Sequence, residues 1–228
     1  YDQANQGKIN LEQAVAFARQ DNFSQAANYA KQAENNLNFS INKLESIKDN
    51  FFITNLTPAV EQLNNAESLL ISAQFLSKAV AGGANFGLSL ESLLGEDKKL
   101  SFSKLTPEEK REVLKKIFES APELNGIKAD LDLAYINLDK AGTSGILFVF
   151  KNKISQIKTQ ISQASLILEK AVPLSQLVPA LAGYPVQVDY LVVLQNNDEL
   201  RPTGGFLGTY GILQIKDGDI ISFNTHDI

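Results

Sequence analysis

The chain of 228 residues contains no cysteine, no methionine, no tryptophan and only one histidine, His226. Without cysteine it cannot form disulfides, thiol nucleophiles, cysteine-ligated zinc sites or iron–sulfur clusters. A Ser-His-Asp triad would have to use His226, whose neighbour in the sequence is Asp227. Neighbouring residues of a strand point to opposite faces, so Asp227 is badly placed to orient the imidazole. These absences disfavour thiol, zinc-thiolate and triad chemistry, and we expect His226 to be an ordinary strand-end residue.

The missing methionine bears on where the chain starts. A chain translated from its own start codon normally begins with Met, whereas this one begins with Tyr1, so we expect a processed product or part of a longer protein. No run of about 18 uninterrupted apolar residues is present, and no signal-peptide pattern is visible. The longest apolar run spans only residues 146–150. We therefore expect no membrane span within these residues.

The composition is that of a globular protein, with 44% hydrophobic and 21% charged residues. The net charge of −5 disfavours general nucleic-acid binding. The charge is uneven: residues 1–187 carry 19 basic and 20 acidic side chains, a net −1, and residues 188–228 carry 2 basic and 6 acidic ones, a net −4. The hydrophobic period changes at the same point. We therefore predict a helical domain over 1–187 and the start of a β-containing domain over 188–228.

Apolar residues before residue 187 recur at alternating steps of three and four, which keeps one stripe facing a partner helix. Four such stripes predict a long antiparallel helical bundle. They consist of Phe23, Ala26, Ala30, Ala33, Leu37, Ser40, Leu44, Ile47 and Phe51, where only Ser40 breaks the apolar series; of Leu63, Ala66, Leu70, Ala73, Ser77 and Val80; of Leu124, Ile127, Leu131, Ala134 and Leu138; and of Phe150, Ile154, Ile157, Ile161, Ala164, Leu168 and Ala171.

Helix boundaries are marked by caps and by helix breakers. Thr106-Pro107 with Glu109 has the pattern of a capping box, and Asp21-Asn22 predicts a turn between two helices. Glycines at positions 82, 83 and 87 predict a break, followed by a loop with a short helix. Pro173, Pro179 and Gly183 predict a short helix or turn after Ala171.

Three strands are predicted after Val186. Residues 188–194 are nearly continuously apolar, which is typical of a buried strand. Residues 209–215 and 220–223 flank Asp217-Gly218, a strong hairpin signal. A three-stranded sheet has open edges, so we expect the native domain to continue past Ile228. The predicted fold class is α+β, mostly α, with a helical bundle followed by an incomplete sheet portion.

The connection between the first two strands is the candidate ligand-binding segment. Its candidate ligand-binding residues are Asn196, Asn197, Asp198, Glu199, Arg201, Thr203, Gly204 and Gly205. Arg201 offers a planar fork of donors suited to phosphate, and the two glycines let the backbone approach a ligand closely. Asp198, with Asp227, would supply oxygen ligands for magnesium. Alternatively, this is a tight turn whose Arg201 pairs with its own Asp198 or Glu199.

The run Gln195-Asn196-Asn197-Asp198-Glu199-Leu200-Arg201-Pro202-Thr203-Gly204-Gly205-Phe206, with a strand on each side, resembles the opening motif of the bacterial domain-of-unknown-function 4012 family. The preceding helices are similar to the helical region of that family, so the resemblance extends over most of the chain. It implies an extracytoplasmic cell-envelope protein, anchored by an N-terminal span that these residues lack. It implies no particular reaction.

Two functions remain open at this stage. The first is a helical stalk or interaction platform carrying a β-containing head, with other envelope proteins or a second copy of the chain as partners and no evident cofactor. The second is an envelope enzyme similar to the LytR-CpsA-Psr glycopolymer phosphotransferases, with Arg201 on phosphate and Asp198 or Asp227 on magnesium. Where that family has Arg-Asp, this chain has His226-Asp227, which weakens the second alternative.

Overall fold

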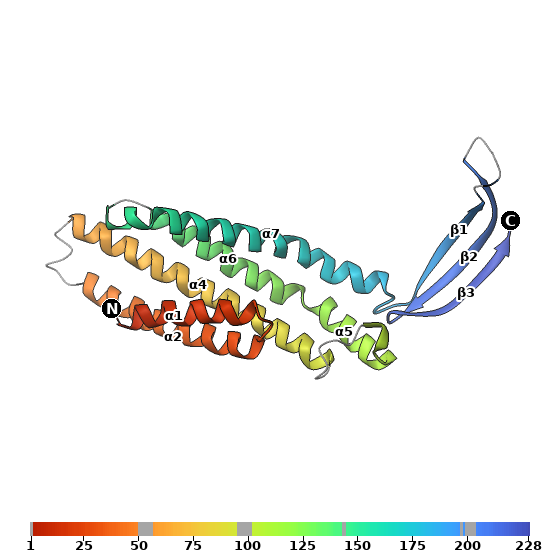
Figure 1. Cartoon of the computed structure of the whole chain (residues 1–228), viewed down its shortest axis with the longest axis horizontal. Coiled ribbons are helices and arrows are strands. Elements are labelled where there is room, and N and C mark those ends of the chain that lie inside the picture. Colours follow the sequence, from red (N-terminus) through yellow and green to blue (C-terminus); the bar gives the residue numbers. More distant parts are fainter. Residues whose placement is uncertain (1, 50–56, 95–101, 143–144, 197, 199–203) are drawn as a thin grey trace. The chain divides into compact units, whose positions relative to one another are not determined.

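The computed structural model describes residues 2–49, 57–94, 102–142, 145–196, 198 and 204–228. These residues form six α-helices, two short 3-10 helices and three β-strands (Figure 1), which confirms the mostly-α α+β fold class. In chain order the helices and strands are α1 (Asp2–Ala18), α2 (Phe23–Lys48), α4 (Thr57–Leu94), η1 (Phe102–Lys104), α5 (Pro107–Glu119), α6 (Ala121–Lys140), η2 (Gly145–Phe150), α7 (Lys151–Leu181), β1 (Val188–Asn196), β2 (Phe206–Lys216) and β3 (Asp219–Asp227).

The chain divides into two compact units, which we describe separately. Unit 1 comprises Tyr1–Ser89 with Pro122–Val172, and unit 2 comprises Leu90–Ala121 with Pro173–Ile228. The boundaries between the units fall within α4, at the start of α6 and within α7. The division into residues 1–187 and 188–228 stays a prediction.

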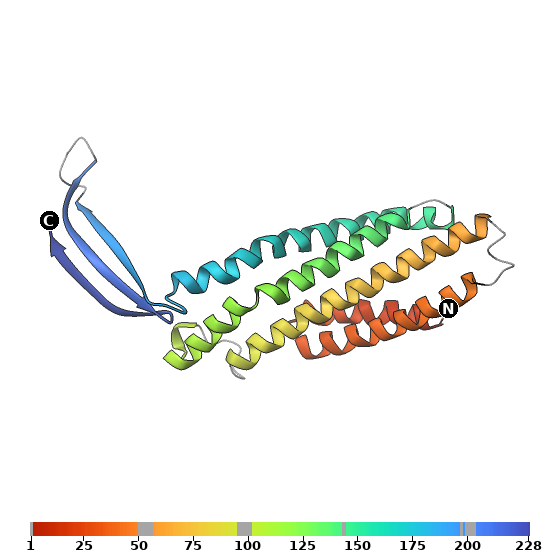
Figure 2. The same ribbon diagram turned by 180° about the vertical axis from the view of Figure 1, so that it is seen from behind.

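In unit 1, α1 and α2 form a helical hairpin whose helices lie side by side in Figures 1 and 2. Small residues allow this approach: a β-carbon on Gly7 would lie only 2.8 Å from Cγ of Leu37. The predicted turn at Asp21-Asn22 is confirmed. Asp21 has a φ of 56°, and the side chain of Asn22 caps α2 by accepting a hydrogen bond from the Gln25 amide at 3.2 Å.

The hydrophobic core of unit 1 lies between α4, α6 and α7. Ser72 of α4 also donates a hydrogen bond to the Ala134 carbonyl of α6 at 2.8 Å. The stripe predicted on α6 is the one that is buried here, and most of the stripe predicted on α7 packs against it. The buried members of this core are Ala79, Leu124, Ile127, Leu131, Ala134, Leu138, Ile154 and Ile161.

The break predicted at the α4 glycines is wrong, because α4 runs without interruption from Thr57 to Leu94. Two of the glycines serve close packing instead. A β-carbon on Gly82 would lie 2.8 Å from Cγ1 of Ile127, and one on Gly87 would lie 2.8 Å from the ring of Phe23. The helix tolerates the propensity cost of about 1 kcal/mol per glycine because neighbouring side chains fill the space.

The break predicted at Pro173 and Pro179 is also wrong, because both prolines lie inside α7, which ends at Leu181. Each proline removes one helical hydrogen bond. Pro179 is fully buried and its carbonyl accepts from the Tyr184 amide at 2.9 Å, so packing and end contacts hold this part of the helix. Gly183, with a φ of 81°, ends the segment as predicted.

In unit 2, α5 begins with the predicted capping box. The Thr106 side chain accepts from the Glu109 amide at 3.3 Å, and the Glu109 carboxylate accepts from the Thr106 amide at 2.8 Å. Val113 and Leu114 of α5 are buried.

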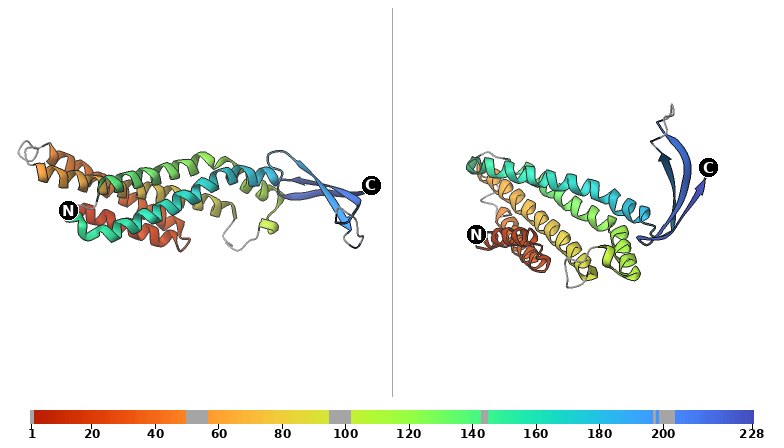
Figure 3. Two further views of the ribbon diagram at one scale, coloured as in Figure 1. Left: turned by 90° about the horizontal axis from the view of Figure 1, so that it is seen from above. Right: turned by 45° about the vertical axis from the view of Figure 1, so that its right-hand side comes forward.

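The three strands of unit 2 form an antiparallel sheet in the order β1-β2-β3 (Figure 3). The Asp217-Gly218 turn is confirmed, with φ values of 51° and 85°. The apolar run of β1 predicted a strand buried on both faces, and this prediction is wrong. Val188, Tyr190 and Val192 are half-buried, whereas Leu191 and Val193 on the opposite face are exposed within this chain.

One helical segment among the described residues, Leu147–Leu181, is long and apolar enough to cross a membrane by length and composition alone. The most apolar 18-residue window of this segment has a mean hydropathy of 1.2, and the segment contains Glu169 and Lys170. Only 11% of that window is buried among the described residues, and length and composition alone do not assign a span to the segment.

Candidate functional site

The predicted ligand-binding segment joins β1 to β2. Asn196 is the last residue of β1, and Asp198, Gly204 and Gly205 are also described. Four of the candidates, Asn197, Glu199, Arg201 and Thr203, lie outside the described residues. The choice between a ligand site and a tight turn therefore depends on residues whose positions are not described, and both alternatives stay predictions.

The described part of this segment has the local geometry of a turn. The backbone amide of Asp198 donates to Oδ1 of Asn196 at 3.0 Å, so this side-chain oxygen is engaged within the loop. Gly204 has a φ of 92°. A β-carbon on Gly205 would lie 2.6 Å from Nε2 of the Gln195 side chain and 2.7 Å from the backbone carbonyl oxygen of Asn196. Both glycines are thus required by the backbone of the turn itself.

The second magnesium candidate, Asp227, lies opposite Thr209 at the end of β3. Its neighbour His226 stacks on Tyr210, with ring centroids 5.2 Å apart, and points to the other face of the sheet. Among the described residues, no group of three or more histidine or acidic side chains is arranged to hold a metal. The structure does not bring Asp198 and Asp227 into such a group, and magnesium binding stays a prediction.

A cluster of basic and aromatic side chains lies elsewhere in unit 2, around the buried Tyr184. The Arg111 guanidinium lies 5.5 Å from the centroid of this ring, and the Phe118 ring meets it edge-on at 5.7 Å. Lys110 pairs with Asp219 at 2.5 Å, and Arg111 pairs with Asp217 at 2.9 Å. Because these cations are held by carboxylates of the β2–β3 hairpin, the cluster joins α5 to the hairpin rather than offering an anion site.

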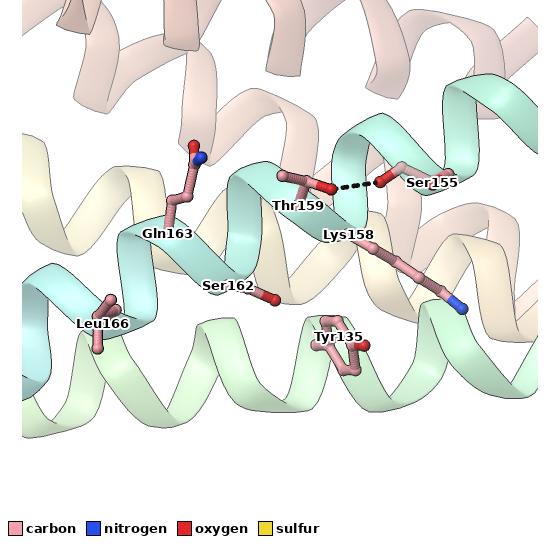
Figure 4. A pocket seen from close by; sticks show the side chains of 7 residues that line it. All are labelled: Tyr135, Ser155, Lys158, Thr159, Ser162, Gln163 and Leu166. Atoms are coloured by element: carbon pink, nitrogen blue, oxygen red, sulfur yellow. Dashed lines mark hydrogen bonds between the residues drawn. The ribbon is translucent and has the colours of Figure 1, made fainter.

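In unit 1, an open groove runs between α6 and α7 (Figure 4). It consists of two adjoining cavities of about 430 and 420 Å³ that share Tyr135, Ser162 and Leu166. Figure 4 shows Tyr135 rising from α6 toward α7, with Ser162 directed into the space between the helices and Thr159 and Gln163 on the other side of α7.

One end of the groove is organised by Asp132. Its carboxylate accepts hydrogen bonds from Nζ of Lys128 and from Oγ of Ser165, both at 2.7 Å. Partial burial acts to raise the pKa of Asp132, but these two hydrogen bonds and the Lys128 charge together hold the pKa below its ordinary value. The hydrogen bond to Asp132 raises the pKa of Lys128, and the charge of Glu169 adds to this effect. Glu169 therefore lies near Lys128 at this end.

The other end of the groove is organised by Lys158. Its ammonium lies 2.7 Å from Oδ1 of Asp139 and 5.9 Å from the centroid of the Tyr135 ring. Between the two ends, apolar side chains face solvent: Tyr135 is 38% exposed, Ile136 is 46% exposed and Leu166 is 53% exposed. An open strip with apolar residues at its centre and ion pairs at its ends can bind the surface of another protein.

The groove was not predicted from the sequence. The stripe from Leu124 to Leu138 predicts one contact face of α6, which is the face buried in the core. Leu133, Tyr135 and Ile136 lie outside that stripe and are all exposed. Tyr135 and Ile136, two adjacent large apolar residues outside an already complete stripe, were the available signal for a second contact face.

Comparison with known proteins identifies one relationship. Residues 187–227 match the model of a family described as "Protein of unknown function (DUF4012)", which confirms the resemblance over this segment. No curated protein and no solved structure matches the chain. The match covers the three strands and their connections, and assigns no reaction to them.

Proposed function

We propose that this chain belongs to an extracytoplasmic protein of the bacterial cell envelope, in which the helical unit is an interaction platform and the sheet is part of a β-containing head. The α6/α7 groove is the observation that carries the proposal. It presents Tyr135, Ile136 and Leu166 to solvent between two sets of ion pairs. These three side chains line one cavity, and apolar side chains that adjoin one another at the surface are typical of a protein interaction site.

The envelope location rests on the family resemblance, which the match to residues 187–227 supports. The interaction role rests on the geometry of unit 1. A phosphotransferase role has no comparable support, because its proposed phosphate ligand, Arg201, lies outside the described residues.

Photo-cross-linking in the native bacterium tests both parts of the proposal. A photoreactive amino acid replaces Ile136 in the groove, and the matched control replaces Asn28, an exposed position on α2. We expect cross-linked products from position 136 but not from position 28, in the envelope fraction and accessible to protease added from outside. Protein recovered from the cytosol, or equal cross-linking at the two positions, would contradict the proposal.

A further inference from the structure

We propose that the partner in the α6/α7 groove is a second copy of this chain, docked face to face so that each helix of the groove lies antiparallel to its counterpart. This inference rests on the proposed function and names its partner. It is carried by the self-complementary placement of charges on the two helices.

The charged residues of α7 have the spacing that such a contact requires. Lys158 and Glu169 are eleven residues apart, about three helical turns, so they share one face of the helix. They lie at equal distances on either side of the point between Gln163 and Ala164. A 180° rotation about an axis through that point, at right angles to the helix, exchanges the positions of Lys158 and Glu169.

The charged residues of α6 repeat this arrangement. Lys128 and Asp139 are also eleven residues apart, on either side of the point between Leu133 and Ala134. The rotation that exchanges the charges of α7 therefore also exchanges those of α6, provided that the two midpoints lie at the same level along the groove.

Two contacts between the helices set that level. Asp139 pairs with Lys158, and Asp132 accepts a hydrogen bond from Ser165, each at 2.7 Å. Both contacts place the α6 midpoint beside the α7 midpoint, because α6 and α7 run antiparallel. A single two-fold axis therefore relates both pairs of charges. It lies in the plane of the interface and runs across the groove, at right angles to both helices.

A second copy generated by this axis brings opposite charges together at these four positions. Lys158 of each copy faces Glu169 of the other, and Lys128 faces Asp139. At the centre, the exposed apolar side chains of Ile136 and Leu166 pack across the interface, and the small Ser162 leaves room for the approach. The contact is isologous, since the same patch is used twice, and so it closes as a dimer.

Sedimentation velocity of the 228-residue chain at low salt tests the inference, over about 1 to 100 µM, the range expected for a modest symmetric interface. We expect the wild-type chain to dimerise. Glu169→Lys places like charges opposite each other twice, and should raise the dimer Kd about tenfold or more. Glu45→Lys makes the same charge change on an exposed face of α2, and should leave the Kd within about twofold.

The double variant Lys158→Glu with Glu169→Lys tests the orientation. In the antiparallel arrangement it exchanges the partners and should return the Kd to within about threefold of wild type. With a two-fold axis parallel to the helices, Lys158 would instead face Asp139 and Glu169 would face Lys128, and the double variant would be weaker than either single variant. Circular dichroism melting of each variant confirms that it is folded.

Three results would overturn the inference: a wild-type chain that stays monomeric over the whole range, a Glu169→Lys variant no weaker than Glu45→Lys, or a double variant that is not restored. A monomeric chain whose position 136 cross-links to a different envelope protein would overturn this inference and leave the proposed function standing. A chain that neither dimerises nor cross-links at position 136 would overturn both.

Discussion

Gly87 of α4 lies against the ring of Phe23, the first residue of α2, so closely that a β-carbon at position 87 would be 2.8 Å from Cδ1 and Cγ of the ring. Four residues earlier in the same helix, Gly83 has no neighbouring atom within 4 Å of the position its β-carbon would take. The two glycines have the same backbone conformation and opposite surroundings, which makes them a matched pair.

Gly87→Ala should lower the free energy of unfolding, whereas Gly83→Ala should raise it. Alanine in a helix interior is favoured over glycine by about 1 kcal/mol, the gain expected at position 83. At position 87 the overlap with Phe23 costs about 1–3 kcal/mol, so the net change is a loss of about 1 kcal/mol. Urea denaturation of the two variants measures both values, and equal shifts in the same direction would show that α2 does not pack against α4 as described.

The two acidic residues of the β2–β3 hairpin should differ in their contributions to stability. Asp219 pairs with Lys110, whose side chain is only 10% exposed, whereas Asp217 pairs with the half-exposed Arg111. Asp219→Asn leaves a mostly buried ammonium without its counter-charge and should cost about 2 kcal/mol. Asp217→Asn keeps a residue that tolerates the left-handed conformation, and should cost less than about 1 kcal/mol. Thermal unfolding of the two variants at neutral pH gives the comparison. A larger loss for Asp217→Asn would contradict this account of the cluster.

Asp130 and Asp132, two residues apart on α6, should affect the pH dependence of stability with opposite signs. Burial raises the pKa of Asp130, with the Lys78 charge opposing this effect, whereas the hydrogen bonds and charge around Asp132 keep its pKa below the ordinary value of 3.8. The ionised form of Asp132 is thus favoured by folding. Its contribution is present above its unfolded pKa and is lost as the pH falls through its lower folded pKa.

For Asp130 the sign reverses, because folding favours its protonated form. The folded state is penalised once the pH exceeds the raised pKa, and the penalty disappears below the unfolded pKa near 3.8. Asp130→Asn should therefore raise the free energy of unfolding at pH 7 and Asp132→Asn should lower it. Both differences should shrink toward zero in acid. Denaturation curves at several pH values check this, and the same sign for both variants at pH 7 would refute the assignment.

The fold could be predicted where local chemistry decides the structure. Thr106 with Glu109 forms the predicted capping box, and Asp217-Gly218 forms the predicted hairpin turn, because each depends on neighbouring residues only. The glycines of α4 and the prolines of α7 misled the prediction. Gly82 is accommodated by close packing against Ile127 of another helix, and Pro179 by the burial of its side chain. Local propensity describes neither effect.

The candidate site shows the same contrast. The composition of the β1–β2 connection predicted ligand binding by Asp198 and Gly205. The described contacts of these two residues are those of a turn. The α6/α7 groove depends on which sides of two helices stay uncovered after the core has formed. Tyr135 and Leu166 become neighbours only because α6 packs against α7. Since they are far apart in the sequence, the groove could not be predicted from local patterns.

The absence of cysteine from the chain allows a direct measurement of association through the groove. A single cysteine at Ser162 faces into the groove, and a single cysteine at Gln160 lies on an exposed part of α7 away from it. With a short thiol-specific bifunctional reagent, we predict that the Ser162→Cys chain forms a covalent dimer at micromolar concentration and that the Gln160→Cys chain stays monomeric. No covalent dimer from Ser162→Cys, or equal yields from the two positions, would contradict the central claim that this groove is the surface through which the chain associates.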